Sequence, residues 1–191
     1  MKRVIITGAS KGIGKAIRNL LESPIFLTGE PKYKVADLSR TSGVDLTKLS
    51  DSQIRNILNE LNPHILILNA GVWKNEWKLN YEVSRAMAER MPKDKLVIFL
   101  LSNAAYRSYG NDDYTAAKSG LLHYANRKQM EGYHFATIAP GTVDTGFWDK
   151  AEVDSRKRGC LSPAVIADSV YHIIKQAEKG ALITEMIILP S

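Results

Sequence analysis

The chain has 191 residues, of which 45% are hydrophobic, an ordinary composition for a globular protein that can bury a substantial core. The net charge of +6 comes from 26 basic and 20 acidic residues that form no long block, so we interpret it as a solvated surface and expect no nucleic-acid partner. The longest strand-like apolar run, Leu96 to Leu101, is far too short for a membrane span, and no membrane association is expected.

The amino end and the cysteine content point to a cytoplasmic protein. A first strand that begins almost at Met1 is expected to leave no room for a signal peptide. Cys160 is the only cysteine, which excludes an intramolecular disulfide and a cysteine metal cluster and fits a reducing compartment. The four histidines are dispersed, so no metal site is predicted.

Apolar runs of strand length alternate with helical patterns along the chain, which is typical of βαβ units around a parallel sheet. Strands are predicted over residues 3–7, 33–39, 64–69, 95–101, 133–139 and 183–189, and helices over 12–22, 49–61, 79–91, 112–130 and 163–178. We therefore predict one α/β domain over residues 1–191, a Rossmann-like, doubly wound parallel sheet in three αβα layers.

One connection in this pattern is unusually short. Only a few residues separate Arg40, after the second predicted strand, from Val44 and Asp45. A parallel crossover needs a dozen or more residues, so a strand at Val44 could not be wound beside the second strand through a helix of its own. The sequence predicts about six strands, with the third strand missing or vestigial and one edge of the sheet truncated.

A glycine-rich segment, Thr7-Gly8-Ala9-Ser10-Lys11-Gly12-Ile13-Gly14, joins the first predicted strand to the first predicted helix. Glycine permits backbone conformations and close approaches that a Cβ would block. The amino end of a helix presents free N–H groups and a positive dipole end to a pyrophosphate. A glycine turn that only packs the helix on the strand is the alternative, but the strand–loop–helix context favours a dinucleotide site.

The end of the second predicted strand distinguishes the two nicotinamide dinucleotides. A carboxylate there hydrogen-bonds the adenosine ribose of NAD, whereas an arginine accommodates the 2′-phosphate of NADP. The chain has Ser39-Arg40-Thr41, a hydroxyl followed by a guanidinium that suits a phosphate. Asp37 shares a strand face with Ser39 by alternation and keeps NAD(H) possible. We therefore predict NADP(H) as the preferred cofactor.

A tyrosine and a lysine four residues apart form the predicted catalytic pair. This spacing occurs three times, as Tyr114/Lys118, Tyr124/Lys128 and Tyr171/Lys175. Only Tyr114 follows shortly after an apolar strand that ends in a serine, Ser102, so we select the first pair and interpret the other two as pairs on helix surfaces.

The i, i+4 spacing puts both side chains of the selected pair on one helix face. Reduction of a ketone needs a proton for the developing alkoxide, and the ordinary pKa of tyrosine, near 10, is high for that exchange at neutral pH. A nearby ammonium favours the phenolate. We therefore expect Lys118 to lower the pKa of Tyr114.

In chain order, the glycine segment, Asn69-Ala70-Gly71, Ser102, the Tyr114/Lys118 pair and Pro140-Gly141-Thr142-Val143-Asp144-Thr145 resemble the short-chain dehydrogenase/reductase family over nearly the whole chain. The resemblance implies that Lys118 also hydrogen-bonds the nicotinamide ribose and that Ser102 orients the substrate oxygen. The predicted cofactor contacts are Gly8, Ser10, Lys11, Gly12, Ile13, Gly14, Ser39, Arg40, Thr41, Asp45, Leu46, Asn69, Ala70, Gly71, Tyr114, Lys118, Pro140, Gly141, Thr142, Val143 and Thr145.

The family also uses an asparagine that holds a water molecule beside the lysine. Asn80 is assigned to this catalytic position, although it follows Asn69 by a shorter interval than family members commonly show, and Asn75 is the alternative. The resemblance further implies a homodimer or homotetramer that pairs through the helices bearing Asn80 and Tyr114. Trp73 and Trp148 each follow a cofactor motif and either pack or line a pocket for an apolar or aromatic carbonyl compound.

The leading hypothesis is an enzyme that transfers hydride between NADP(H) and a small-molecule carbonyl compound or secondary alcohol, with Tyr114 as general acid and base. The alternative is a catalytically silent NADP-binding sensor or scaffold protein on the same fold, because fold does not fix function. An epimerase or dehydratase of the extended family is disfavoured because a carboxyl-terminal substrate domain is absent from the sequence. The substrate and the direction of the reaction stay open.

Overall fold

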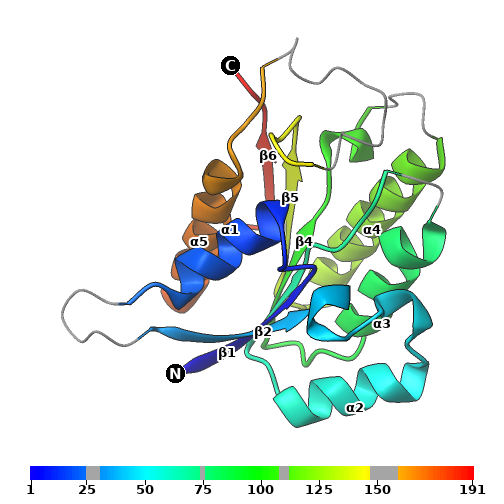
Figure 1. Ribbon diagram of the computed structural model, residues 1–191, viewed down its shortest axis with the longest axis vertical. Helices are drawn as coiled ribbons and strands as arrows, with labels where there is room; N and C mark the ends of the chain where they lie inside the picture. Colours follow the sequence, from blue (N-terminus) through cyan, green and yellow to red (C-terminus); the bar gives the residue numbers. More distant parts are fainter. Residues whose placement is uncertain (25–30, 74–75, 108–111, 147–158) are drawn as a thin grey trace.

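The computed structural model describes residues 1–24, 31–73, 76–107, 112–146 and 159–191. Six parallel strands form one sheet in the order β2-β1-β3-β4-β5-β6 (Figure 1). The strands are β1 (Lys2–Thr7), β2 (Tyr33–Leu38), β3 (Ile65–Leu68), β4 (Leu96–Leu100), β5 (Phe135–Pro140) and β6 (Glu185–Ile188). The sheet confirms the predicted parallel α/β fold.

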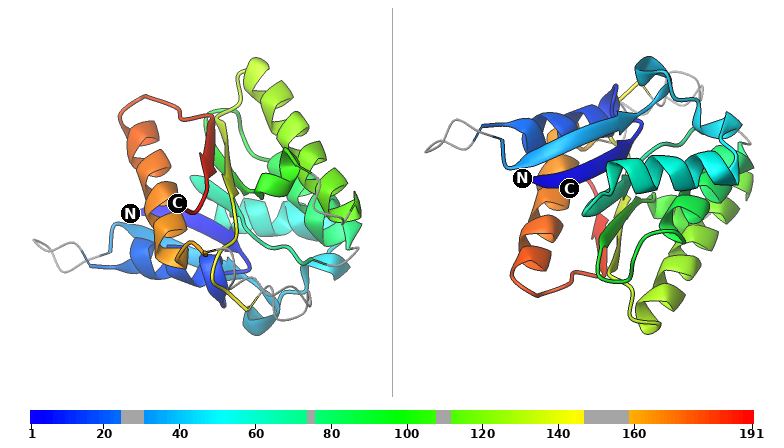
Figure 2. Two further views of the ribbon diagram at one scale, coloured as in Figure 1. Left: turned by 90° about the horizontal axis from the view of Figure 1, so that it is seen from above. Right: turned by 90° about the horizontal axis from the view of Figure 1, so that it is seen from below.

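Helices cover both faces of the sheet. On one side lie α1 (Gly12–Glu22) and α5 (Pro163–Glu178), and on the other lie α2 (Asp51–Leu61), α3 (Val83–Ala88) and α4 (Asp112–Met130) (Figures 1 and 2). Each face has its own core, one built around Ile6, Ile17 and Ile173 and the other around Phe99 and Leu121. All five residues of β4 are buried, which explains its unbroken apolar sequence and confirms the three-layer arrangement.

The missing third strand is confirmed at the β2 edge. After β2 the chain forms two short 3₁₀ turns, η1 (Arg40–Ser42) and η2 (Leu46–Lys48), and then enters α2. Gly43, with φ +85°, reverses the chain between these turns, and the Ser42 hydroxyl accepts from the backbone N–H of Ser39 at 3.0 Å. The next strand, β3, pairs with the opposite side of β1, so β2 has no outer neighbour among the described residues.

Local capping sets the helix boundaries. The predicted bounds of α1, α4 and α5 match the structure, and Ser162 caps α5 by accepting from the backbone N–H of Ala164. Helix α2 begins two residues later than predicted because Ser50 and Gln53 form a capping box around its first turn.

Among the helices of the described ranges, none is both long and apolar enough to cross a membrane.

The helix predicted over residues 79–91 differs from the structure. It opens as a π-helical segment, η3 (Lys78–Glu82), continues as α3 and tightens at its end through i→i+3 bonds such as the one from Arg90 N–H to the Met87 carbonyl at 3.2 Å. Asn80, buried within η3, bonds the backbone of Val72. The helical prediction is thus confirmed over most of its range, but hydrophobic periodicity carries no information about such a contact and could not indicate the π-helical start.

Candidate active site

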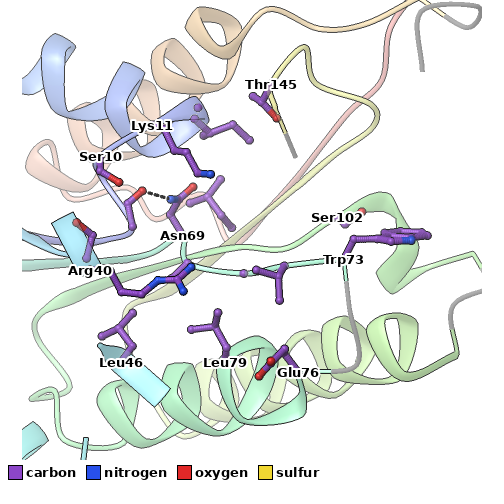
Figure 3. Close-up of a pocket in the computed structure, with 18 of the residues that line it drawn as sticks. Ser10, Lys11, Arg40, Leu46, Asn69, Trp73, Glu76, Leu79, Ser102 and Thr145 are labelled. Carbon is purple, nitrogen blue, oxygen red and sulfur yellow. Dashed lines mark hydrogen bonds between the residues drawn. The ribbon is translucent and has the colours of Figure 1, made fainter. Parts of the chain in front are cut away.

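A cavity of about 660 Å³ lies at the carboxyl ends of the central strands (Figure 3). Its volume is in the range of small-molecule and cofactor sites. The strand order reverses beside β1, since β2 lies on one side and β3 on the other, and open α/β sheets bind ligands at such a switch point. The predicted site residues that line the cavity are Gly8, Ser10, Lys11, Gly12, Ile13, Ser39, Arg40, Thr41, Asp45, Leu46, Asn69, Ala70, Gly71, Ser102, Tyr114, Lys118, Pro140, Gly141, Val143 and Thr145.

Three predicted site residues, Gly14, Thr142 and Asn80, do not belong to the cavity lining. A Cβ added to Gly14 would lie 2.3 Å from the Gly8 carbonyl oxygen, so this glycine is required for helix–loop packing rather than for ligand contact. Sequence reasoning also missed lining residues that no motif marks: Leu38, Val44, Thr47, Val72, Glu76, Leu79, Leu100, Leu101 and Gly146. Only their proximity in sequence to predicted residues could have indicated them.

The glycine loop is hydrogen-bonded to the side chain of Asp37. One carboxylate oxygen of Asp37 accepts from the backbone N–H of Ala9 at 3.0 Å, and the other accepts from the Ser39 hydroxyl at 2.9 Å. The Arg18 guanidinium lies 4.0 Å from the same carboxylate, which is 9% exposed. Asp37 is therefore engaged inside the protein, and it does not belong to the cavity lining, so the structure does not place it where the predicted alternative, binding of a ribose, needs it.

The segment Asn69-Ala70-Gly71 is tied to the glycine loop across the switch point. The Asn69 amide nitrogen donates to the carbonyl oxygens of Thr7 at 3.1 Å and Gly8 at 3.0 Å. The Thr7 hydroxyl in turn accepts from the backbone N–H groups of Asn69 and Ala70. These bonds join the ends of β1 and β3 into one rigid floor of the cavity.

Two cations project into the half of the cavity beside the glycine loop. The side chains of Lys11 and Arg40 point into it, with Ser10 beside them (Figure 3). The first turn of α1, which is fully described, has no acidic residue that would neutralise its positive end. Since the Ser39 hydroxyl donates to Asp37, a phosphate here would be bound by Lys11, Arg40 and backbone N–H groups.

The acidic residue on η2 is engaged locally. Asp45 caps this turn by accepting from the hydroxyl and backbone N–H of Thr47, and these bonds hold the pKa of Asp45 below its ordinary value. The Lys48 ammonium lies 3.9 Å from it. Asp45 and Leu46 line the cavity, so the structure brings both predicted contacts to the same cavity as the glycine loop.

The predicted catalytic residues converge at the other half of the cavity. Tyr114 and Lys118 project from α4, and Ser102 follows β4 and is hydrogen-bonded to Tyr114. The Lys118 ammonium lies 5.7 Å from the centre of the Tyr114 ring and donates to the Leu100 carbonyl at 3.1 Å. The structure thus places three hydroxyl and amine groups suited to proton transfer in the same cavity as the glycine loop.

The expectation that Lys118 lowers the pKa of Tyr114 is wrong for this structure. Burial raises the pKa of Tyr114 to about 12, and the hydrogen bond with Ser102 only partly opposes the rise. Burial also lowers the pKa of Lys118 to about 8. A low-dielectric environment disfavours the charged form of both groups, so desolvation sets the direction of both pKa changes.

The other two Tyr/Lys pairs lie outside the cavity. Lys128 is bonded to Glu131, and Lys175 to Glu178. Tyr124 is buried and packs against Phe99 in the core, so its interpretation as a surface residue is wrong.

Asn80 supports the cavity from outside its lining. Its side-chain oxygen accepts from the Val72 N–H at 2.9 Å, and its nitrogen donates to the Val72 carbonyl at 2.8 Å. A Cβ added to Gly71 would lie 3.1 Å from the Asn80 oxygen and 3.5 Å from the Lys118 nitrogen, so these side chains approach each other across this glycine. The alternative candidate, Asn75, lies outside the described residues.

An aromatic side chain lies beside Tyr114. The rings of Trp73 and Tyr114 are 5.2 Å apart between centres and inclined at 47°. Trp73 is half-buried and lines the cavity at the end occupied by Ser102 (Figure 3). Trp148 lies outside the described residues.

Comparison with family models found no match. Over 189 residues, the chain is 25% identical to the 3-oxoacyl-[acyl-carrier-protein] reductase FabG of Rickettsia conorii, with 82% of this chain and 78% of that protein covered. Two dehydrogenases are among the solved structures with a similar fold. An alcohol dehydrogenase from Thermococcus sibiricus, complexed with 5-hydroxy-NADP, has a TM-score of 0.77 at 20% identity. The match covers 98% of this chain and 96% of that chain.

The second structure is a 3-alpha-hydroxysteroid dehydrogenase from Pseudomonas sp. B-0831, complexed with NADH. It has a TM-score of 0.78 at 17% identity, and the match covers 98% of this chain and 95% of that chain. At these identities the two structures establish the fold alone. The sequence relatives, the ordered motifs and the six-stranded parallel sheet agree with one another. By these findings the chain is similar in sequence and in fold to oxidoreductases of the short-chain dehydrogenase/reductase family.

Proposed function

We propose that the protein transfers hydride between NADP(H) and a small carbonyl compound or secondary alcohol. The convergence of Ser102, Tyr114 and Lys118 in the cavity that also contains the glycine loop carries this proposal. A nucleotide-binding protein without catalysis would not need a buried lysine beside a buried tyrosine, because burying an ionisable amine costs free energy.

The cavity residues fit a dinucleotide with an additional phosphate. The open amino end of α1 and the side chains of Lys11 and Arg40 match phosphate groups, and Asp37 is already bonded to the glycine loop. Relatives on this fold are complexed with either 5-hydroxy-NADP or NADH, so these residues decide our choice of NADP(H). When bound, the cofactor supplies or accepts the hydride.

Tyr114 is the proposed general acid and base. With a pKa raised to about 12, its hydroxyl is protonated at neutral pH and can donate to a substrate oxygen as negative charge develops there. Ser102, bonded to Tyr114, orients the same oxygen. Lys118, whose pKa falls to about 8, can hold a proton near the tyrosine and hydrogen-bond a cofactor hydroxyl. Asn80 is proposed as a positioning residue because its side chain bonds the Val72 backbone.

The test is a titration with NADPH and NADH, followed by a panel of ketones and aldehydes with the preferred nucleotide. We expect tighter binding of NADPH and turnover of at least part of the panel. Tyr114→Phe should bind NADPH as the wild type does and lose at least about a hundredfold in kcat, because it removes only the exchangeable proton.

Two results would contradict the proposal. A clear preference for NADH would refute the role given to Arg40. Nucleotide binding without turnover of any carbonyl compound would favour a sensor or scaffold protein instead.

A further inference from the structure

We propose that Trp73 is a specificity-determining residue that selects carbonyl compounds with a planar aromatic group next to the carbonyl carbon. The inference rests on the proposed function, since it names the substrate class of the same site. Trp73 lines the cavity, half-buried, with its ring 5.2 Å from the ring of Tyr114. Nothing in the cofactor-binding role of this cavity requires an indole at that place.

Hydrogen bonds hold the backbone that leads to this indole. Val72, directly before Trp73, is bonded through both its N–H and its carbonyl to the side chain of Asn80. Asn69, at the other end of the same short segment, is bonded to the carbonyl oxygens of Thr7 and Gly8. Hydrogen bonds at Asn69 and Val72 thus hold the backbone up to the residue before Trp73, whose ring lies against that of Tyr114.

The placement of the proton donor determines which part of a substrate lies against Trp73. Ser102 and Tyr114 are hydrogen-bonded to each other, so an oxygen held by both hydroxyls lies at their end of the cavity. Trp73 and Ser102 lie together at this end (Figure 3). A group attached to the carbonyl carbon is thereby brought against the aromatic pair, where a planar ring gains offset or edge-to-face contacts that a saturated ring lacks.

The experiment compares acetophenone with cyclohexyl methyl ketone, two ketones of similar size that differ in aromaticity. Their kcat/KM values with NADPH and their dissociation constants with and without NADP⁺ are measured for the wild type, Trp73→Ala, Trp73→Phe and Trp77→Ala. Trp77 is a matched control, because it is exposed, packs on Tyr81 and does not line the cavity.

We expect the wild type to prefer acetophenone, both in binding and in kcat/KM. Trp73→Ala should reduce this preference about fivefold, since the aromatic contact is lost while the volume effect is common to both ketones. Trp73→Phe should retain most of the preference, and Trp77→Ala should leave it unchanged.

The inference is overturned if the wild type binds both ketones equally or binds neither. It is also overturned if Trp73→Ala lowers kcat for both ketones by the same factor, because Trp73 would then only support Tyr114. A binding preference for acetophenone that depends on Trp73, without turnover of either ketone or of any compound in the carbonyl panel, would uphold the inference and contradict the proposed function.

Discussion

Asp37 illustrates how one side chain takes a role that its position in the sequence does not reveal. Its place near the end of β2 suggested a ribose ligand, yet both carboxylate oxygens are bonded within the protein, to the Ala9 N–H and the Ser39 hydroxyl. Strand alternation correctly put Asp37 and Ser39 on one face. It could not show that the glycine loop folds back onto that face and provides a donor.

We predict that Asp37→Ala weakens binding of NADPH and NADH by a similar factor, about tenfold. The substitution leaves the Ala9 N–H without its acceptor, at a cost of about 1–3 kcal/mol, and loosens the loop that both nucleotides share. Fluorescence titration and thermal unfolding measure the two effects. Asp37→Asn, which keeps one acceptor oxygen, is the control and should lose less. Weaker binding of NADH alone would mean that Asp37 contacts the ribose.

Tyr114 shows the limit of sequence reasoning for chemistry. The strand ending in Ser102 selected, among the three pairs, the one that lines the cavity. The direction of the pKa change was nevertheless wrong, because it depends on how deeply α4 packs against the sheet. Tyr114 is 6% exposed and Lys118 4%, and spacing along a helix cannot indicate this burial.

At the scale of elements, the π-helical segment η3 connects the helix layer to the cavity. Regular helices such as α1 and α5 follow from periodicity and capping residues and were predicted to their ends. Segment η3 places Asn80 where its side chain bonds the backbone of Val72, a contact between residues eight positions apart that no periodic pattern encodes.

Asn80→Ala should therefore expose the Val72 amide and weaken the segment that carries Trp73. Losing two hydrogen bonds at a buried position should lower the free energy of unfolding by about 2 kcal/mol. The local readout is hydrogen exchange of the Val72 N–H, which should accelerate in the variant. Asn59→Ala, at an exposed position of α2, is the matched control and should change stability by less than about 0.5 kcal/mol. Unchanged protection at Val72 would contradict the positioning role.

At the scale of the molecule, Glu178 joins the end of α5 to the sheet at the side opposite the cavity. Its carboxylate accepts from the Tyr33 hydroxyl at 2.9 Å, and the ammonium groups of Lys2, Lys32 and Lys175 lie 3.3, 2.6 and 2.8 Å from it. Burial alone would raise the pKa of Glu178, but the hydrogen bonds outweigh it and lower the pKa to about 2.

Glu178→Gln should lower the free energy of unfolding by about 2 kcal/mol at neutral pH. Because the folded-state pKa lies below the unfolded value near 4.3, this contribution is present above about pH 5 and is lost as the pH falls toward 2. Denaturation curves of both proteins should therefore converge over that range. Glu89→Gln, in an exposed pair with Arg85, serves as the control and should change stability by less than about 1 kcal/mol. A difference that is constant with pH would exclude the carboxylate as its source.

The unpartnered edge at β2 determines where this chain tolerates changes in length. An outermost strand shares one ladder with its neighbour, so its addition or loss leaves the register of every inner pair intact, whereas a change inside the sheet would break two ladders. The residues between Ser39 and Ser50 follow β2 at this edge of the sheet, and Arg40 and Asp45 among them also line the cavity. Insertions or deletions there would spare the scaffold and alter the choice of nucleotide, so chain length and cofactor selection are expected to vary together at this one border.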